Sequence, residues 1–263
     1  MSALTALFRG AGRPLLMPYA VGGYPETAGC LEILRTYLKN GADLVELGIP
    51  FSDPLADGPV IQSASQVALR NGVRPVDVLE LAGTAAGEGA RVVLLSYLNT
   101  ILAFDPERFF DQCRDRGVLG VVVPDLPVEE AAQLQAAART RGVDVILLAA
   151  PTSTEERLAR IAAAASGFIY CVSTTGVTGA RKSLRKDLPA FVARIRRHTE
   201  LPLAVGFGVS TIEQAEEVAG YADGVIIGSA LVDMVARAGS QADGLTEIGR
   251  YLYQVRSTPS FSR

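Results

Sequence analysis

Eight short apolar runs recur along the chain, and a helical segment follows each of them. The runs are mostly continuous in their apolar character, which is typical of strands in a parallel sheet that is covered on both faces. Parallel strands need crossover connections, and the helical segments supply them. The expected strands are Pro14–Val21, the first part of Asp43–Gln62, Arg91–Asn99, Val118–Pro127, Val143–Ala150, Gly167–Ser173, Leu201–Gly208 and Ala222–Ala230.

This repetition predicts an α/β fold, closed into a single (β/α)8 TIM barrel. The length of 263 residues suits such a barrel, and no linker or shift in composition divides the chain, so we expect one domain over residues 1–263. An open, doubly wound sheet is the alternative. The Gly-x-Gly-x-x-Gly turn that would favour it is missing after the first expected strand.

Charge and composition exclude several classes of partner. The hydrophobic content of 49% is ample for a large core, and the net charge of −3 gives no field that would attract nucleic acid or an anionic membrane. The first apolar residues are interrupted early by glycine and proline, so we expect neither a signal peptide nor a membrane span there. These features predict a cytoplasmic protein.

The scarce residue types restrict the chemistry. His198 is the one histidine, so a multi-histidine metal site and a histidine-based triad are both unfavourable, and we expect it at a helix C-terminus. No lysine lies in an apolar strand, which argues against a buried Schiff base. We expect reduced, buried thiols at Cys30, Cys113 and Cys171.

Two acidic residues near the second strand are the candidate catalytic groups. Strand alternation places Glu46 on the same face as Leu44, so its carboxyl group is expected on an apolar face. It is either a buried structural group with a partner or a proton-transfer group whose pKa burial raises. Asp57 follows in a loop rich in proline and glycine, where an acid can also serve only to shape a turn.

Barrel active sites lie where strands end, so the residues there are candidates for substrate binding. Gly206, Phe207 and Gly208 end the seventh strand, and Gly228 with Ser229 ends the eighth, where a short helix would open. Glycines and a helix N-terminus at these positions predict a phosphate site, although each alone could be only a turn. Other side chains expected near the strand ends are Tyr19, Tyr97, Asn99, Asp125 and Tyr170.

Several local features carry further expectations. The polar segment 174–189 is either a mobile lid or an ordinary exposed loop. Asp105 with Pro106, Ser153 with Glu156, and Ser210 with Glu213 are expected to begin helices. We expect one helix from about Pro75 to Glu88 after the second strand, and a frayed tail in residues 257–263.

Five motifs, in this order and spacing, resemble the α subunit of tryptophan synthase along nearly the whole chain. They are LVELGIPFSDPLADGPVIQ, PDLPVEE, STTGVTGAR, GFGVS and GVIIGSALV. The resemblance implies retro-aldol cleavage of indole-3-glycerol phosphate to indole and glyceraldehyde 3-phosphate. It also implies an α2β2 heterotetramer with a β subunit that carries pyridoxal phosphate, and no cofactor in this chain.

The resemblance also implies roles for individual residues. Glu46 would be the general acid/base, Asp57 would bind the indole N–H, and Thr178 of the lid would hold Asp57. Tyr19 stands where better-known members carry phenylalanine. The expected indole contacts are Tyr19, Ile61, Tyr170 and Phe207, and the expected phosphate contacts are Gly179, Gly208, Gly228 and Ser229, with Tyr97 and Gly206 beside them.

The β subunit is expected to dock over the loop after the second strand, with Pro50, Phe51 and Asp53 in or near the contact. These three residues could also form only a turn with a capping aspartate. The sequence leaves three other functions open: a stand-alone indole-3-glycerol phosphate lyase, a non-catalytic subunit that only gates its partner, and a different sugar-phosphate isomerase.

Overall fold

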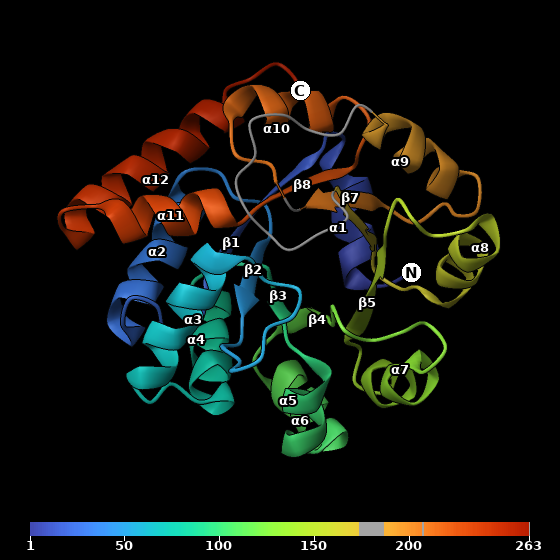
Figure 1. The fold of residues 1–263 in the computed structure, drawn as a ribbon, viewed down its shortest axis with the longest axis horizontal. Helices are drawn as coiled ribbons and strands as arrows, with labels where there is room; N and C mark the ends of the chain where they lie inside the picture. The colour runs from blue at the N-terminus through green and yellow to red at the C-terminus, as the bar shows by residue number, and fades with distance from the viewer. Residues whose placement is uncertain (174–186, 207, 263) are drawn as a thin grey trace.

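The computed structural model describes residues 1–173, 187–206 and 208–262, and its parallel strands form a closed barrel (Figure 1). Neighbouring strands follow the order of the chain, and the last strand pairs with the first. The predicted (β/α)8 TIM barrel is therefore confirmed, and the open sheet is excluded. The strands are β1 (Leu15–Val21), β2 (Val45–Gly48), β3 (Val92–Leu95), β4 (Val118–Val122), β5 (Asp144–Ala149), β6 (Ile169–Val172), β7 (Leu203–Gly206) and β8 (Gly224–Ile227).

Helices surround the barrel on its outer side (Figure 1). Leu4 and Phe8 of the first helix approach Gly120 in β4 and Gly224 in β8, so this helix closes the end at which the strands begin. The helices are α1 (Ala3–Ala11), α2 (Thr27–Lys39), α3 (Pro59–Arg70), α4 (Pro75–Gly87), α5 (Leu98–Phe104), α6 (Pro106–Asp115), α7 (Ala131–Arg139), α8 (Glu155–Ala164), α9 (Leu188–Arg196), α10 (Ile212–Ala219), α11 (Ser229–Arg237) and α12 (Gln241–Arg256).

Two aspartates hold neighbouring strands together at the end of the barrel where the strands begin. Asp43 precedes β2 and accepts hydrogen bonds from Leu16 N at 2.9 Å and from Arg13 at 2.7 and 2.8 Å. Asp223 precedes β8 and accepts in the same way from Leu203 N at 2.7 Å. These contacts tie β1 to β2 and β7 to β8. In the register of β1 and β2, Tyr19 lies opposite Glu46.

The structure corrects the expected ends of several elements. The third strand stops at Leu95, and Asn99 lies in α5 instead of at a strand end. Tyr97 is the N-cap residue of α5, and Asp125 accepts from Leu98 N in its first turn at 2.9 Å. The Asp125 carboxylate is thereby used at the start of a helix. The sequence analysis also missed α3, which precedes the expected helix at α4.

Two of the three predicted helix caps were displaced by one residue. Asp105 begins α6 as expected and accepts from Arg108 N at 3.1 Å. The cap of α8 is Thr154, not Ser153, and that of α10 is Thr211 with Gln214, not Ser210 with Glu213. In both cases a threonine follows the serine, and the threonine has the extended backbone that a cap needs.

The C-terminal tail and the three cysteines are packed into the core, and the histidine contacts a glutamate. The prediction of a frayed tail was wrong, because Phe261 is fully buried. The prediction of three buried, free cysteines is confirmed. His198 lies just beyond α9, with Nε2 2.9 Å from Glu155 Oε2. Over the described residues, no helix combines the length and the hydropathy needed to cross a bilayer.

Candidate active site

A cavity at the end of the barrel where the strands finish collects most of the candidate residues. It has about 380 Å³ of empty space, its opening to solvent included, and β1, β2, β3, β6 and β8 contribute to its wall. Leu95 and Ile226 were missed by the sequence analysis, because inward and outward residues look alike in continuously apolar strands. The lining residues are Tyr19, Glu46, Asp57, Ile61, Leu95, Tyr170, Gly208, Ile226, Gly228 and Ser229.

Glu46 lies in the middle of β2 and points into this cavity. It is 1% exposed, and its Oε1 atom has no hydrogen-bond partner among the described residues. Burial, together with the nearby charge of Asp57, raises the pKa of Glu46 to about 8. Glu46 therefore carries a proton at neutral pH and can give it up to a bound molecule, so the alternative of a buried structural group with a fixed partner is not supported.

Asp57 is held at the mouth by its own loop. Its N–H group donates to Pro54 O at 3.0 Å, and its carbonyl oxygen accepts from Gln62 Nε2 at 2.7 Å. Burial raises the pKa of Asp57 to about 6, while a hydrogen bond with the Tyr97 hydroxyl opposes that rise. Asp57 is consequently ionised at neutral pH although it is only 5% exposed.

Tyr97 supports Asp57 from behind instead of lining the cavity. Its hydroxyl oxygen accepts a hydrogen bond from Ala56 N at 3.0 Å, and its ring stacks on Phe51 at 5.0 Å between centroids. The same hydroxyl binds the side chain of Asp57. One aromatic side chain thus fixes both the backbone and the carboxylate of the loop after β2.

Two tyrosines are seated over glycines of neighbouring strands. A Cβ atom at Gly48 would lie 2.2 Å from the hydroxyl oxygen of Tyr19, and one at Gly206 would lie 2.2 Å from that of Tyr170. Any larger residue at either glycine would displace the ring, so these two glycines shape the cavity wall. Gly206, predicted as part of a phosphate site, has this structural use and does not line the cavity.

The opposite side of the cavity has the features of an anion site. Gly208 has φ +81°, a backbone conformation that favours glycine, and Gly228 precedes the first turn of α11. That helix has no side-chain cap at its N-terminus and no acidic residue in its first turn. Its positive end is therefore available to an anion beside Ser229, which lines the same cavity.

Three predicted site residues, Thr178, Gly179 and Phe207, lie outside the described residues, and so does most of the expected lid. Within the described ranges, no cluster of three or more histidine, cysteine, aspartate or glutamate side chains could hold a metal ion. The site that can be described contains two carboxylates of different pKa, an aromatic wall and a helix N-terminus.

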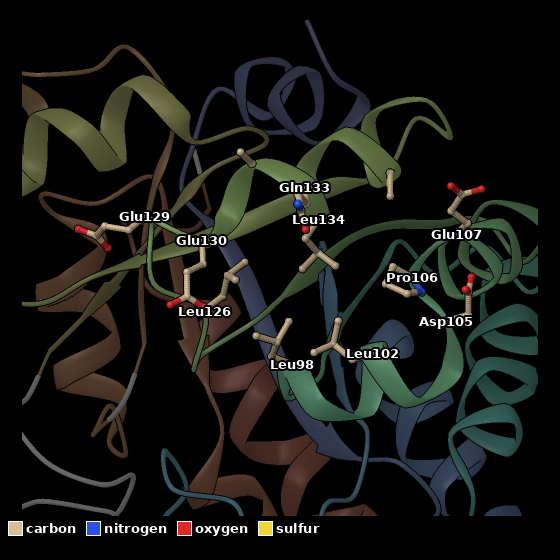
Figure 2. Close-up of a pocket in the computed structure, with 12 residues that line it drawn as sticks. Leu98, Leu102, Asp105, Pro106, Glu107, Leu126, Glu129, Glu130, Gln133 and Leu134 are labelled. Atoms are coloured by element: carbon tan, nitrogen blue, oxygen red, sulfur yellow. The ribbon is translucent and has the colours of Figure 1, made fainter.

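A second, larger hollow lies outside the barrel, between α5, α6 and α7, with about 1390 Å³ of empty space. Leu98 and Leu102 of α5 face Leu126 and Leu134 across it (Figure 2). Its rim carries Asp105, Glu107, Glu129 and Glu130. No strand end reaches this groove, so it is a surface feature separate from the cavity at the mouth.

Comparison with known proteins identifies the family. The family model "Tryptophan synthase alpha chain" matches residues 6–255. The tryptophan synthase alpha chain of Roseiflexus sp. is 49% identical over 235 residues, which cover 89% of this chain and 90% of that one. A structure of Mycobacterium tuberculosis tryptophan synthase aligns with a TM-score of 0.89 at 37% identity, covering 98% and 99% of the two chains.

Tryptophan synthase subunit alpha from Legionella pneumophila also aligns with a TM-score of 0.89, at 32% identity over 100% of this chain and 99% of the other. Matches of this extent leave no segment of the barrel outside the likeness. This chain belongs to the tryptophan synthase alpha chain family.

Proposed function

We propose that this protein cleaves indole-3-glycerol phosphate to indole and glyceraldehyde 3-phosphate, as the lyase subunit of tryptophan synthase. The observation that carries the proposal is the pair of buried carboxylates at the mouth, one protonated and one ionised at neutral pH. A retro-aldol cleavage needs an acid, a base and a place for the bonding electrons. The indole ring provides that place once it is protonated.

Glu46 performs the proton transfers. Its carboxyl group donates a proton to C3 of the indole ring, and the resulting carboxylate then takes the proton of the hydroxyl group on the adjoining carbon. The bond between the ring and that carbon breaks, its electrons return to the ring, and an aldehyde forms. The raised pKa of Glu46 suits both steps, because a group that titrates near neutral pH can donate and accept.

Asp57 stabilises the positive charge that develops at the indole nitrogen. It is ionised, nearly buried and held by Tyr97, so it needs little rearrangement when the charge appears. The aromatic wall of Tyr19 and Tyr170, with Ile61, receives the ring. Gly208, Gly228 and Ser229, together with Gly179, receive the phosphate at the N-terminus of α11. Phe207 contacts the indole ring, and Thr178 holds Asp57.

A pyridoxal-phosphate β subunit is the proposed partner, in a cytoplasmic α2β2 heterotetramer, and this chain itself needs no cofactor. Pro50, Phe51 and Asp53 lie in the loop that carries Asp57, and Phe51 stacks on Tyr97. Leu55 of the same loop and Leu102 of α5 are exposed apolar side chains. Leu102 also lines the groove of Figure 2, whose rim is acidic.

The test is indole release from indole-3-glycerol phosphate, measured with and without the β subunit. We expect slow release by the chain alone and faster release in the complex. Equal rates with and without the partner would favour a stand-alone lyase, to which the family match lends no support. Turnover of other sugar phosphates with none of this substrate would contradict the proposal.

A further inference from the structure

The ring of Tyr19 spans the distance between the two ends of the site. A Cβ atom at Gly228 would lie 3.6 Å from the near side of the Tyr19 side chain, and one at Gly48 would lie 2.2 Å from its hydroxyl oxygen. The near side of the ring therefore adjoins the start of α11, and its hydroxyl group lies at the end of β2. This places the hydroxyl group on the carboxylate side of the cavity.

The hydroxyl group of Tyr19 has an unused proton to donate. It makes no hydrogen bond with another described residue, although the side chain is 4% exposed and lines the cavity. Burial raises the pKa of the Tyr19 hydroxyl, and the nearby ionisable groups raise it further. Among these groups Asp57 has the largest effect, followed by Glu46, Tyr97 and Tyr37. A buried donor without a partner is costly, so its natural use is toward a carboxylate or a bound molecule.

Asp57 needs such a donor because no cation among the described residues supports it. Within the described ranges, no lysine or arginine contributes to the pKa of Asp57, and the group that holds it down is Tyr97. The other ionisable groups around the same space are Glu46, Tyr19 and Tyr170. Neutral phenol hydroxyls are therefore what the described cavity offers to keep this carboxylate ionised away from water.

We propose that Tyr19 is a positioning residue whose hydroxyl group turns toward the carboxylate of Asp57 and stabilises its charged form while the substrate is bound. This inference rests on the proposed function, since Asp57 must be ionised to meet the positive ring nitrogen. Tyr19 and Tyr97 then bracket Asp57 from β1 and from the start of α5. Hydrogen bonds of this kind often tighten only in the enzyme–substrate complex.

The experiment compares the pH profile of kcat, at saturating substrate and in the complete complex, for the wild type and for Tyr19→Phe, because kcat reports the groups of the enzyme–substrate complex. Turnover should fall at low pH as Asp57 is protonated and at high pH as Glu46 loses its proton. Removing the hydroxyl group should move the acid limb of kcat upward by about one pH unit, which lowers kcat about fivefold near pH 6. Above pH 7.5 the ratio of the two kcat values should be smaller than near pH 6, because Asp57 is then ionised in both proteins.

Tyr37→Phe is the matched control. The Tyr37 hydroxyl is buried outside the cavity and donates to the carbonyl oxygen of Tyr19 at 2.9 Å. Removing it disturbs the same strand by the same chemical change without touching the carboxylates. Its profile should keep the wild-type acid limb even if the protein becomes less stable.

Gly48→Ala supplies a second, independent variant. The added methyl group would displace the Tyr19 hydroxyl, so the acid limb should move in the same direction while the phenol is still present. In the double variant with Tyr19→Phe, the limb should move no further than in Tyr19→Phe alone.

The outcomes separate this inference from the proposed function. Wild-type protein that releases no indole overturns both. Active wild type with an unchanged acid limb in Tyr19→Phe, or an equal shift in Tyr37→Phe, overturns the role of Tyr19 alone.

Discussion

At the end of the barrel where strands begin, Asp43 is surrounded by partners, whereas Glu46, three residues further along the chain, is left without one on Oε1 among the described residues. Asp43 binds both terminal nitrogens of Arg13 and a backbone N–H of β1, and Arg256 lies 3.5 Å away. Asp223 repeats the arrangement with Arg196 and Leu203 N.

The difference separates two uses of the same chemical group. A carboxylate with several donors is held in one position and keeps strands in register. A carboxyl group in an apolar wall with an unused oxygen is held in its neutral form and is free to exchange a proton. In this barrel the acids at the end where strands begin stabilise the fold, and those at the end where strands finish can react.

Glu46→Gln should break the reactive end most severely. The amide keeps the size of the side chain but cannot donate and take back a proton, so we expect kcat to fall by at least about 10²-fold. Steady-state indole release in the assembled complex measures it. The far-ultraviolet circular dichroism should be unchanged, and near wild-type turnover would contradict the assignment of Glu46 as the acid and base.

Asp43→Ala should have the opposite effect, lowering stability while leaving turnover largely intact. Removing this carboxylate leaves the Arg13 guanidinium without its partner and Leu16 N without its acceptor. The side chains of Arg13 and Asp43 are only 13% and 16% exposed. We expect a loss of roughly 3 kcal/mol in the free energy of unfolding, measured by urea denaturation, with little change in kcat below the transition. A large loss of kcat in fully folded protein would show that the two ends are not independent.

Much of this comparison could be predicted from the sequence. Continuous apolar runs with helices between them indicated the closed barrel, and an acid inside such a run marked Glu46 as unusual. The cavity brings Glu46 together with Asp57, Tyr19, Ile61 and Tyr170, as the strand-end rule requires.

Other features depend on distances that the sequence does not contain. Asp125 follows β4 as expected, but its carboxylate accepts from Leu98 N at 2.9 Å at the start of α5, and the sequence does not show that contact. Tyr97 supports Asp57 from behind, and Gly206 makes room for the Tyr170 hydroxyl, and neither use follows from residue type. Helix α3 was missed because prolines and glycines before it obscured the helical period of Val60–Arg70.

The pH dependence of stability offers a finer test of the contrast between the two ends. The carboxyl group of Glu46 has a pKa of about 8 in the folded protein and near 4.5 in the unfolded chain, so between these values only the unfolded chain readily releases the proton. Rising pH therefore favours unfolding of the wild type in this window, by no more than about 1.4 kcal/mol per pH unit. Glu46→Gln lacks this contribution, while Asp57 and the other acids remain in both proteins.

The free energy of unfolding of Glu46→Gln, measured by urea denaturation at intervals from pH 5 to pH 8, should gain steadily on that of the wild type. Below about pH 4.5 the difference should level off, because Glu46 is then protonated in both the folded and the unfolded chain. A difference that stays constant from pH 5 to pH 8 would mean that Glu46 finds in the folded protein a partner for its charge. In that case the distinction between the acids at the two ends of the barrel would fail.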